Sequence, residues 1–118
     1  MSVYRLRIDK WNPATVNKLL GCHWATAARL KKVDARMIGH YCKANRIPIA
    51  QGAREVSLTI TIAGRGRPPD PDAFWKSTLD ALVQAEMLVD DSMRFVRQGP
   101  VTIERGPERA TLITLTDL

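Results

Sequence analysis

The sequence has few of the residues and segments that mark disulfide-bonded, secreted or membrane-spanning proteins. It contains two cysteines and two histidines among 118 residues. No apolar run approaches the roughly 18 residues that a membrane-spanning helix requires. The opening residues, MSVYRLRIDKW, lack the apolar segment of a signal peptide. We therefore expect a cytoplasmic chain with no membrane partner.

The two cysteines and two histidines raise the question of a zinc site. Cys22 and His23 are neighbours in the chain, so their side chains point in different directions. Neither this pair nor His40 with Cys42 has the C-x-x-C or H-x-x-x-H spacing of a zinc knuckle. We interpret them as two reduced thiols and two ordinary histidines.

Acidic residues are outnumbered by basic ones. Eighteen lysines and arginines against twelve aspartates and glutamates give a net charge of +6. Such a balance favours a polyanionic partner, because each cation placed on a phosphate releases condensed counterions. Many basic proteins bind no nucleic acid, so the charge becomes informative only where the basic residues surround a reactive site.

No internal repeat, low-complexity tract or linker interrupts the chain, so residues 1–118 are expected to form one domain. Alternating apolar residues predict strands, and apolar residues three to four apart predict helices. The expected elements are a strand at about 4–8, a helix from about 25 to 45, a strand at 56–62, a helix from about 73 to 86, and strands at 94–104 and 110–116. This β-α-β-α-β-β order predicts an α+β domain, with a mixed sheet of about four strands and both helices on one face.

Each predicted helix has an apolar stripe that is expected to face the sheet. The loop at 64–69 precedes the second helix, and Asp72 stands where the N-cap of that helix is expected. The stripe of the first helix comprises Leu30, Val33, Met37, Ile38, Tyr41 and Cys42, and that of the second comprises Trp75, Leu79, Leu82 and Val83.

The segment Asp70-Pro71-Asp72 places two carboxylates two positions apart. Pro71 favours extended geometry at Asp70, and in an extended chain residues i and i+2 point the same way. Carboxylate oxygens arranged in this way are suitable ligands for Mg²⁺ or Mn²⁺. A helix cap would explain Asp72 without a metal, but it leaves Asp70 unexplained.

A further acidic pair, Asp90 and Asp91, follows the second predicted helix. That helix is about 20 Å long at 1.5 Å per residue, and the chain from Glu86 to Asp91 spans at most about 20 Å. Asp91 can therefore reach the Asp70 end of its own chain only if the backbone runs nearly straight back. Otherwise it meets that end of a partner subunit. A solvated turn is the alternative interpretation of the acidic pair.

Basic residues surround the acidic segment. Lys76, one helical turn after Asp72, could stabilise charge that develops on a cleaved phosphate; the alternative is an i,i+4 contact with Asp72 or Asp80. Arg65 and Arg67 lie in the preceding loop. The polar face of the first predicted helix carries further cations, namely Arg29, Lys31, Lys32, Arg36 and Lys43. Such a face either follows a phosphate backbone or is simply solvated.

Together these motifs resemble the core of the RusA family of Holliday junction resolvases. The family's pattern is D-x-D-N-x-x-K, then D-A-L, then a D-D pair after the helix. In this chain the pattern corresponds to Asp70–Lys76, Leu79–Leu82 and Leu88–Ser92, and the spacings agree. The match covers about residues 55–105, with a fainter similarity between Trp11–Asn17 and the family's P-S-x-N motif.

The resemblance implies a homodimer that binds four-way DNA junctions and cuts opposing strands with Mg²⁺ or Mn²⁺. Carried over by position, Asp70, Asp72 and Asp91 become the metal ligands. Asp90 ranks behind Asp91 as a ligand, and Lys76 becomes a catalytic lysine. The sequence departs from the family pattern at position 73, where an alanine replaces an asparagine whose amide could support a ligand carboxylate.

The sequence therefore predicts a metal-dependent endodeoxyribonuclease that resolves four-way junctions, with self-contained sites. The residues expected to contact DNA are Arg65, Arg67, Arg29, Lys31, Lys32 and Arg36. The alternative is a non-catalytic, basic nucleic-acid-binding protein whose acidic residues are caps and turns. Metal-dependent nicking of a synthetic junction separates the two, because a binder would shift the junction on a gel and leave it whole.

Overall fold

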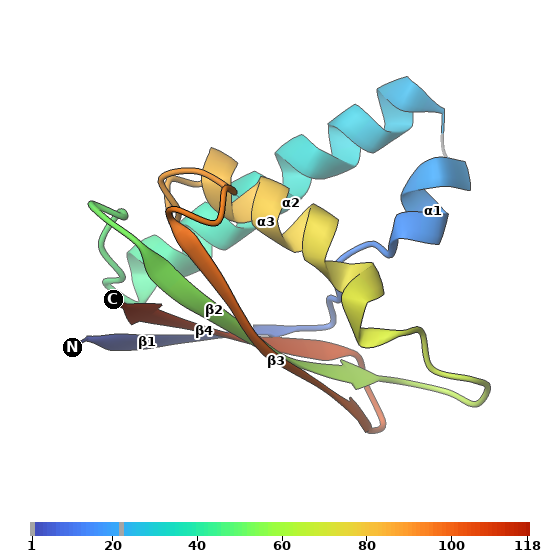
Figure 1. Ribbon diagram of the computed structural model, residues 1–118. Coiled ribbons are helices and arrows are strands. Elements are labelled where there is room, and N and C mark those ends of the chain that lie inside the picture. Colours follow the sequence, from blue (N-terminus) through green and yellow to red (C-terminus); the bar gives the residue numbers. More distant parts are fainter. Residues whose placement is uncertain (1, 22) are drawn as a thin grey trace.

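A four-stranded mixed sheet lies beneath the helices, all of which are on one of its faces (Figure 1). The computed structural model describes residues 2–21 and 23–118. The elements are β1 (Val3–Asp9), α1 (Val16–Gly21), α2 (Trp24–Ala44), β2 (Arg54–Ile62), the 3₁₀ helix η1 (Pro71–Phe74), α3 (Trp75–Gln84), β3 (Val96–Arg105) and β4 (Ala110–Asp117). Among the described residues, no helix combines the length and the apolar character needed to cross a bilayer.

The strand order in the sheet is β1-β4-β2-β3. β4 is antiparallel to both of its neighbours, whereas β2 and β3 are parallel and are joined through α3. The register places Leu6 and Leu58 on either side of Ile113, so inward-facing residues of three strands form one apolar row. The predicted α+β fold with a mixed sheet and helices on one face is therefore confirmed.

The pairing of β3 with β2 is irregular next to Gly99-Pro100. Val56 pairs with Gln98 but Leu58 pairs with Val101, so β3 has an extra residue at this point. A proline cannot donate a hydrogen bond to a neighbouring strand and is therefore confined to edge strands and bulges. The bulge is consistent with the position of β3 at one edge of the sheet.

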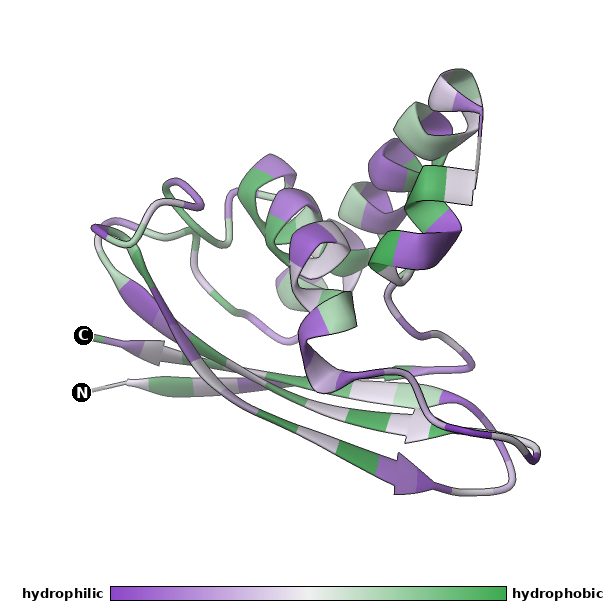
Figure 2. Cartoon of the chain, turned by 45° about the vertical axis from the view of Figure 1, so that its right-hand side comes forward, coloured by the Kyte–Doolittle hydropathy of each residue, from purple (hydrophilic) through white to green (hydrophobic). Residues whose placement is uncertain are grey.

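The core lies between the sheet and the two longer helices. Alternation of apolar and polar residues along the strands, visible in Figure 2, turns one face of the sheet toward α2 and α3. The largest fully buried side chains come from both layers: Leu6, Ile8, Ile38, Leu58, Ile60, Leu82, Leu88, Ile113 and Leu115. Burial on this scale is the main stabilising contribution to such a domain.

Two features differ from the predicted arrangement. Val33, placed in the apolar stripe of the first helix, is 53% exposed, because α2 contacts the core through Ala35, Ile38 and Cys42. The structure also adds two short elements, α1 and η1, which have six and four residues. Segments this short show too little periodicity for an apolar pattern to identify them.

Candidate active site

Asp70 and Asp72 lie on the approach to α3, beyond the end of β2. Asp70 is extended, with φ −63° and ψ 141°, as the following proline requires. Pro71 then begins η1, and the backbone N–H of Ala73 donates to the carbonyl oxygen of Asp70 at 3.0 Å. The prediction that Asp70 and Asp72 share one side of an extended chain is therefore wrong, because the chain has already turned at Asp72.

Neither carboxylate caps a helix. Asp70 precedes η1 without a side-chain cap hydrogen bond, and α3 follows Phe74, which has none either. The expectation that Asp72 is an N-cap is also wrong, since η1 occupies the first turn and Asp72 lies inside it. Capping therefore no longer explains the presence of Asp72, and both aspartates are exposed to solvent.

Asp70 and Asp72 are close in the backbone, and no described cation forms an ion pair with either carboxylate. Their Cα atoms are separated by two peptide units, at most about 7 Å. Within residues 2–21 and 23–118, none of the ion pairs involves Asp70 or Asp72. Two neighbouring carboxylates repel each other unless a cation lies between them. The oxygen donors present here fit a hard divalent cation.

Lys76 extends from the first turn of α3 and contacts Asp80 rather than Asp72. Its Nζ lies 3.3 Å from Oδ2 of Asp80, and the Nζ of Lys31 lies 3.3 Å from the same oxygen. Asp80 is the least exposed of the three side chains, at 16%. The Lys76 end of this pair is 65% exposed, so the pair contributes little stability, and Lys76 can exchange its partner for a phosphate at low cost.

Asp90 and Asp91 follow α3 at the opposite end of the sheet. Oδ1 of Asp90 accepts the backbone N–H of the next residue, Asp91, at 2.8 Å, and the chain bends at Asp91 and Ser92. Asp91 lines a cavity of about 490 Å³ together with Ala53, which precedes β2, and Leu118 at the end of the chain. The pair therefore lies beside the beginning of β2, whereas Asp70 lies beyond its end.

The structure does not bring Asp91 to Asp70 and Asp72 within one chain. β2 has nine residues, which is about 25 Å of extended backbone, and α3 runs back along this length (Figure 1). Instead of returning straight, the chain after α3 forms turns and enters β3. In the described part of the chain, no three His, Cys, Asp or Glu side chains form a group that could hold a metal ion. The expectation of a self-contained site is therefore not met by a single subunit.

The loop before Asp70 is held by an arginine that the sequence did not single out. Gly64 and Gly66 have φ values of +82° and +118°, which glycine adopts without steric cost. Arg105, the last residue of β3, donates to the carbonyl oxygen of Gly64 at 2.9 Å and to that of Gly66. Arg65 and Arg67 are exposed on this loop. Sequence spacing could not reveal Arg105, because it is about forty residues away and is brought close only by strand pairing.

The polar face of α2 presents its cations to solvent, as expected. Arg29, Lys31, Lys32, Arg36 and Lys43 are all exposed. Lys31 is linked to α3 through the Asp80 carboxylate that it shares with Lys76. The basic face of α2 and the candidate acidic site are therefore joined at the first turns of α3.

The two histidines and Cys42 lie in different local environments. The Nδ1 of His23 accepts the backbone N–H of Ala25 at 3.2 Å and so caps α2. Cys42 is fully buried, and burial raises the pKa of its thiol to about 11, partly offset by the positive charge of Arg54. His40 is exposed on α2. Cys22 lies outside the described residues.

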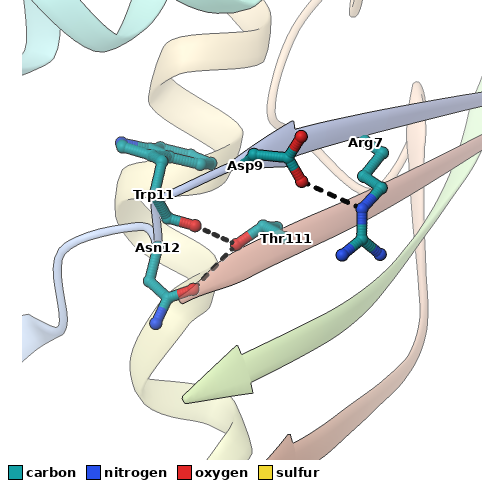
Figure 3. A network of polar contacts seen from close by, with 5 residues as sticks. All are labelled: Arg7, Asp9, Trp11, Asn12 and Thr111. Carbon is teal, nitrogen blue, oxygen red and sulfur yellow. Dashed lines mark hydrogen bonds and ion pairs between the residues drawn. The ribbon is translucent and has the colours of Figure 1, made fainter. Parts of the chain in front are cut away.

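The segment after β1, which carries the fainter similarity to the family motif, is attached to β4. The hydroxyl of Thr111 contacts the carbonyl oxygen of Trp11 at 2.8 Å and the side-chain oxygen of Asn12 at 3.1 Å (Figure 3). The indole N–H of Trp11 donates to Asp34 on α2 at 3.1 Å. Burial raises the pKa of Asp34, while this hydrogen bond and Lys18 lower it. The segment thereby fixes α2 relative to the sheet.

Comparison of the sequence with family models and with curated proteins finds no match to either. The functional interpretation therefore depends on the residues of the site and on the motif resemblance.

Proposed function

We propose that this chain is a metal-dependent endodeoxyribonuclease that cuts branched DNA, with the four-way junction as its substrate. The observation that carries the proposal is the pair Asp70 and Asp72: two exposed carboxylates that form no ion pair with any described residue, in a chain of net charge +6. Arg65 and Arg67 precede the pair, and Lys76 follows it. Cations around an acidic pair suit a phosphodiester that binds together with a divalent metal ion.

Asp70 and Asp72 would hold the ion, which we expect to be Mg²⁺ or Mn²⁺. Such an ion, when bound, supplies an activated water and neutralises charge on the scissile phosphate. The loop arginines hold the strand through its neighbouring phosphates. Lys76 leaves Asp80 and donates to a non-bridging phosphate oxygen, where it stabilises the charge that develops during hydrolysis.

We propose further that the functional unit is a homodimer in which Asp91 completes the site of its partner. β2 and β3 are parallel, so Asp91 lies near their beginnings, while the loop before Asp70 is bonded to Arg105 at the end of β3. A two-fold axis near the middle of β3 would place the beginning of β3 in one protomer beside the end of β3 in its partner. Asp91 of the partner subunit would then approach Asp70 and Asp72.

Charge-removing substitutions of the three aspartates test the site. Asp70→Asn, Asp72→Asn and Asp91→Asn should each abolish cleavage of a synthetic four-way junction, because asparagine keeps the shape and removes the charge that the cation needs. Junction binding on a gel should persist, since it depends mainly on basic residues. Glu108→Gln, an exposed acidic position in the turn before β4, is the matched control and should cut normally. Wild-type cleavage by two of the three aspartate variants would refute the assignment.

A mixed-dimer experiment tests the shared site. A homodimer of Asp70→Asn chains, or of Asp91→Asn chains, has no intact site, whether Asp91 acts within its own chain or across the interface. Any activity after co-expression therefore comes from heterodimers. If Asp91 acts across the interface, one of the two heterodimer sites is intact, and random pairing restores about a quarter of the wild-type sites. Nicking of one strand should then return. A mixture that stays inactive would show that each site lies within one chain.

A non-catalytic nucleic-acid-binding protein is the second candidate. The separation of Asp91 from Asp70 and Asp72 within one chain, and the contact of Lys76 with Asp80, favour it. A junction that is retarded on a gel but stays whole with either metal would select this candidate.

A further inference from the structure

A mainly apolar cavity of about 280 Å³ lies between α1, α2 and the beginning of α3. It is separate from the acidic pair but shares Lys76 with the candidate active site. The apolar part of the wall is formed by Ala14, Leu19, Trp24, Ala27, Ala28 and Leu30. A cavity of this composition with a few polar groups is typical of a site for a planar or apolar ligand group.

Trp24 stands at this cavity with most of its surface open. It is the first residue of α2 and is 78% exposed, and Leu20, four positions earlier on α1, is 79% exposed. The other two tryptophans are used by the fold, since Trp75 is only 8% exposed and Trp11 donates to Asp34. Among the described hydrogen bonds, none involves the indole N–H of Trp24. The ring of His23 lies beside Trp24, with 5.6 Å between the ring centroids, and most of the indole surface stays open to solvent.

Two lysines and two aspartates line the cavity. Lys31 and Lys76 both contact the same oxygen of Asp80, and Asp34 lines the cavity as well, so the four formal charges cancel. Lys76 is the member that a ligand can reach, because its side chain is 65% exposed, and an anionic ligand group that contacts it lies beside an apolar wall. A nucleotide has this combination of properties, with a phosphate at one end and a planar base at the other.

We propose that this cavity binds an unstacked nucleobase next to the phosphate that contacts Lys76, with the base stacked on Trp24. The inference rests on the proposed function, which it extends by naming what the enzyme recognises at a branch point. A base inside a duplex has both faces covered by its neighbours, whereas a base at a branch or in a single strand has a free face. Trp24 would therefore favour branched or single-stranded DNA over duplex.

Binding of a junction and of a duplex of the same sequence to the full-length chain, with Ca²⁺ present to prevent cleavage, tests the proposal. Trp24→Ala should weaken junction binding by about 5- to 150-fold, as expected for loss of one base–aromatic stack, and should leave duplex binding unchanged within about twofold. Trp24→Phe retains an aromatic face and should keep most of the affinity. Ile49→Ala, which removes apolar surface at a position 53% exposed, is the control and should bind both DNAs normally.

A second measurement follows the base itself. The base analogue 2-aminopurine placed at the branch point should lose fluorescence when the wild-type chain binds, because the base stacks on the indole, and should lose less with Trp24→Ala. Unchanged junction affinity in Trp24→Ala, or an equal loss for junction and duplex, would overturn the proposal while leaving the nuclease assignment intact. A wild-type chain that binds neither DNA would overturn the proposed function and this inference with it.

Discussion

Arg54 is a buried charge on the inner face of β2, and its removal should destabilise the fold strongly. The side chain is 3% exposed and donates to three acceptors: Oδ1 of Asp117 at 2.8 Å, the carbonyl oxygen of Met87 at 3.0 Å and that of Pro48 at 2.9 Å. It joins the end of β4, the segment that leads to Asp91, and the connection after α2. Its guanidinium also lies 5.3 Å from the ring centroid of Tyr4.

Arg54→Met keeps much of the aliphatic stem but removes every donor. The carbonyl oxygens of Met87 and Pro48 then lack a partner, and hydrogen bonds from a charged group contribute about 1.5–3 kcal/mol each. Asp117, at 41% exposed, can return to water. Since the buried charge itself no longer has to be desolvated, the expected net loss in the free energy of unfolding is about 3 kcal/mol. For 118 residues the unfolding entropy is about 0.25 kcal/mol/K, so Tm should fall by about 12 °C.

Thermal and urea unfolding followed by circular dichroism measure this change. Arg97→Met is the matched control: Arg97 is exposed and forms one ion pair, with Glu55, so its loss should change stability by less than about 1 kcal/mol. Arg54→Lys should be intermediate, because lysine keeps the charge but cannot reach three acceptors in the fixed geometry of a guanidinium. An Arg54→Met protein as stable as the wild type would refute the claim that these carbonyl oxygens depend on Arg54.

Three further predictions follow from charge and burial. Junction affinity should fall with salt with a log–log slope of about −4 or steeper for the dimer, because several phosphates per subunit are contacted; a flat response would remove the electrostatic support for a DNA partner. Burial raises the pKa of Asp34, so the folded state binds this proton more tightly and stability falls as pH rises through the carboxyl range. Asp34→Asn keeps an acceptor for Trp11 and should raise Tm at neutral pH, a gain that disappears in acid; equal Tm values at both pH values would contradict this. Burial raises the pKa of the Cys42 thiol to about 11, so iodoacetamide at mildly alkaline pH should modify it only when urea unfolds the chain.

The sequence predicts those parts of the fold that depend on residues close together in the chain. Alternation along Val56, Leu58 and Ile60 identifies a strand with one buried face, and all three are buried. Val33 is exposed, contrary to the prediction, because the apolar stripe in the sequence is wider than the face that α2 presents to the core. The turn at Pro71–Phe74 was missed because proline marks a break in the chain without specifying which turn follows.

The candidate site was predictable in its residues but not in its arrangement. The spacing of Asp70, Asp72 and Lys76 is local, and these residues do lie together at the beginning of α3. The position of Asp91 depends on the path of the chain after α3. The number of residues limits how far Asp91 can reach but does not determine that path. Arg105 contacts the Gly64–Gly66 loop only through the pairing of β2 with β3, a long-range property that no sequence window contains.

Cleavage of a synthetic four-way junction by the purified wild-type chain tests the central claim most directly. One strand is labelled at a time, and the junction is incubated with Mg²⁺, with Mn²⁺, and with EDTA, beside a duplex of the same sequence. Paired nicks in opposing strands of the junction are expected with one or both metals, with no cleavage in EDTA and an intact duplex. A junction that is bound and retarded but stays whole under every metal condition would contradict the claim.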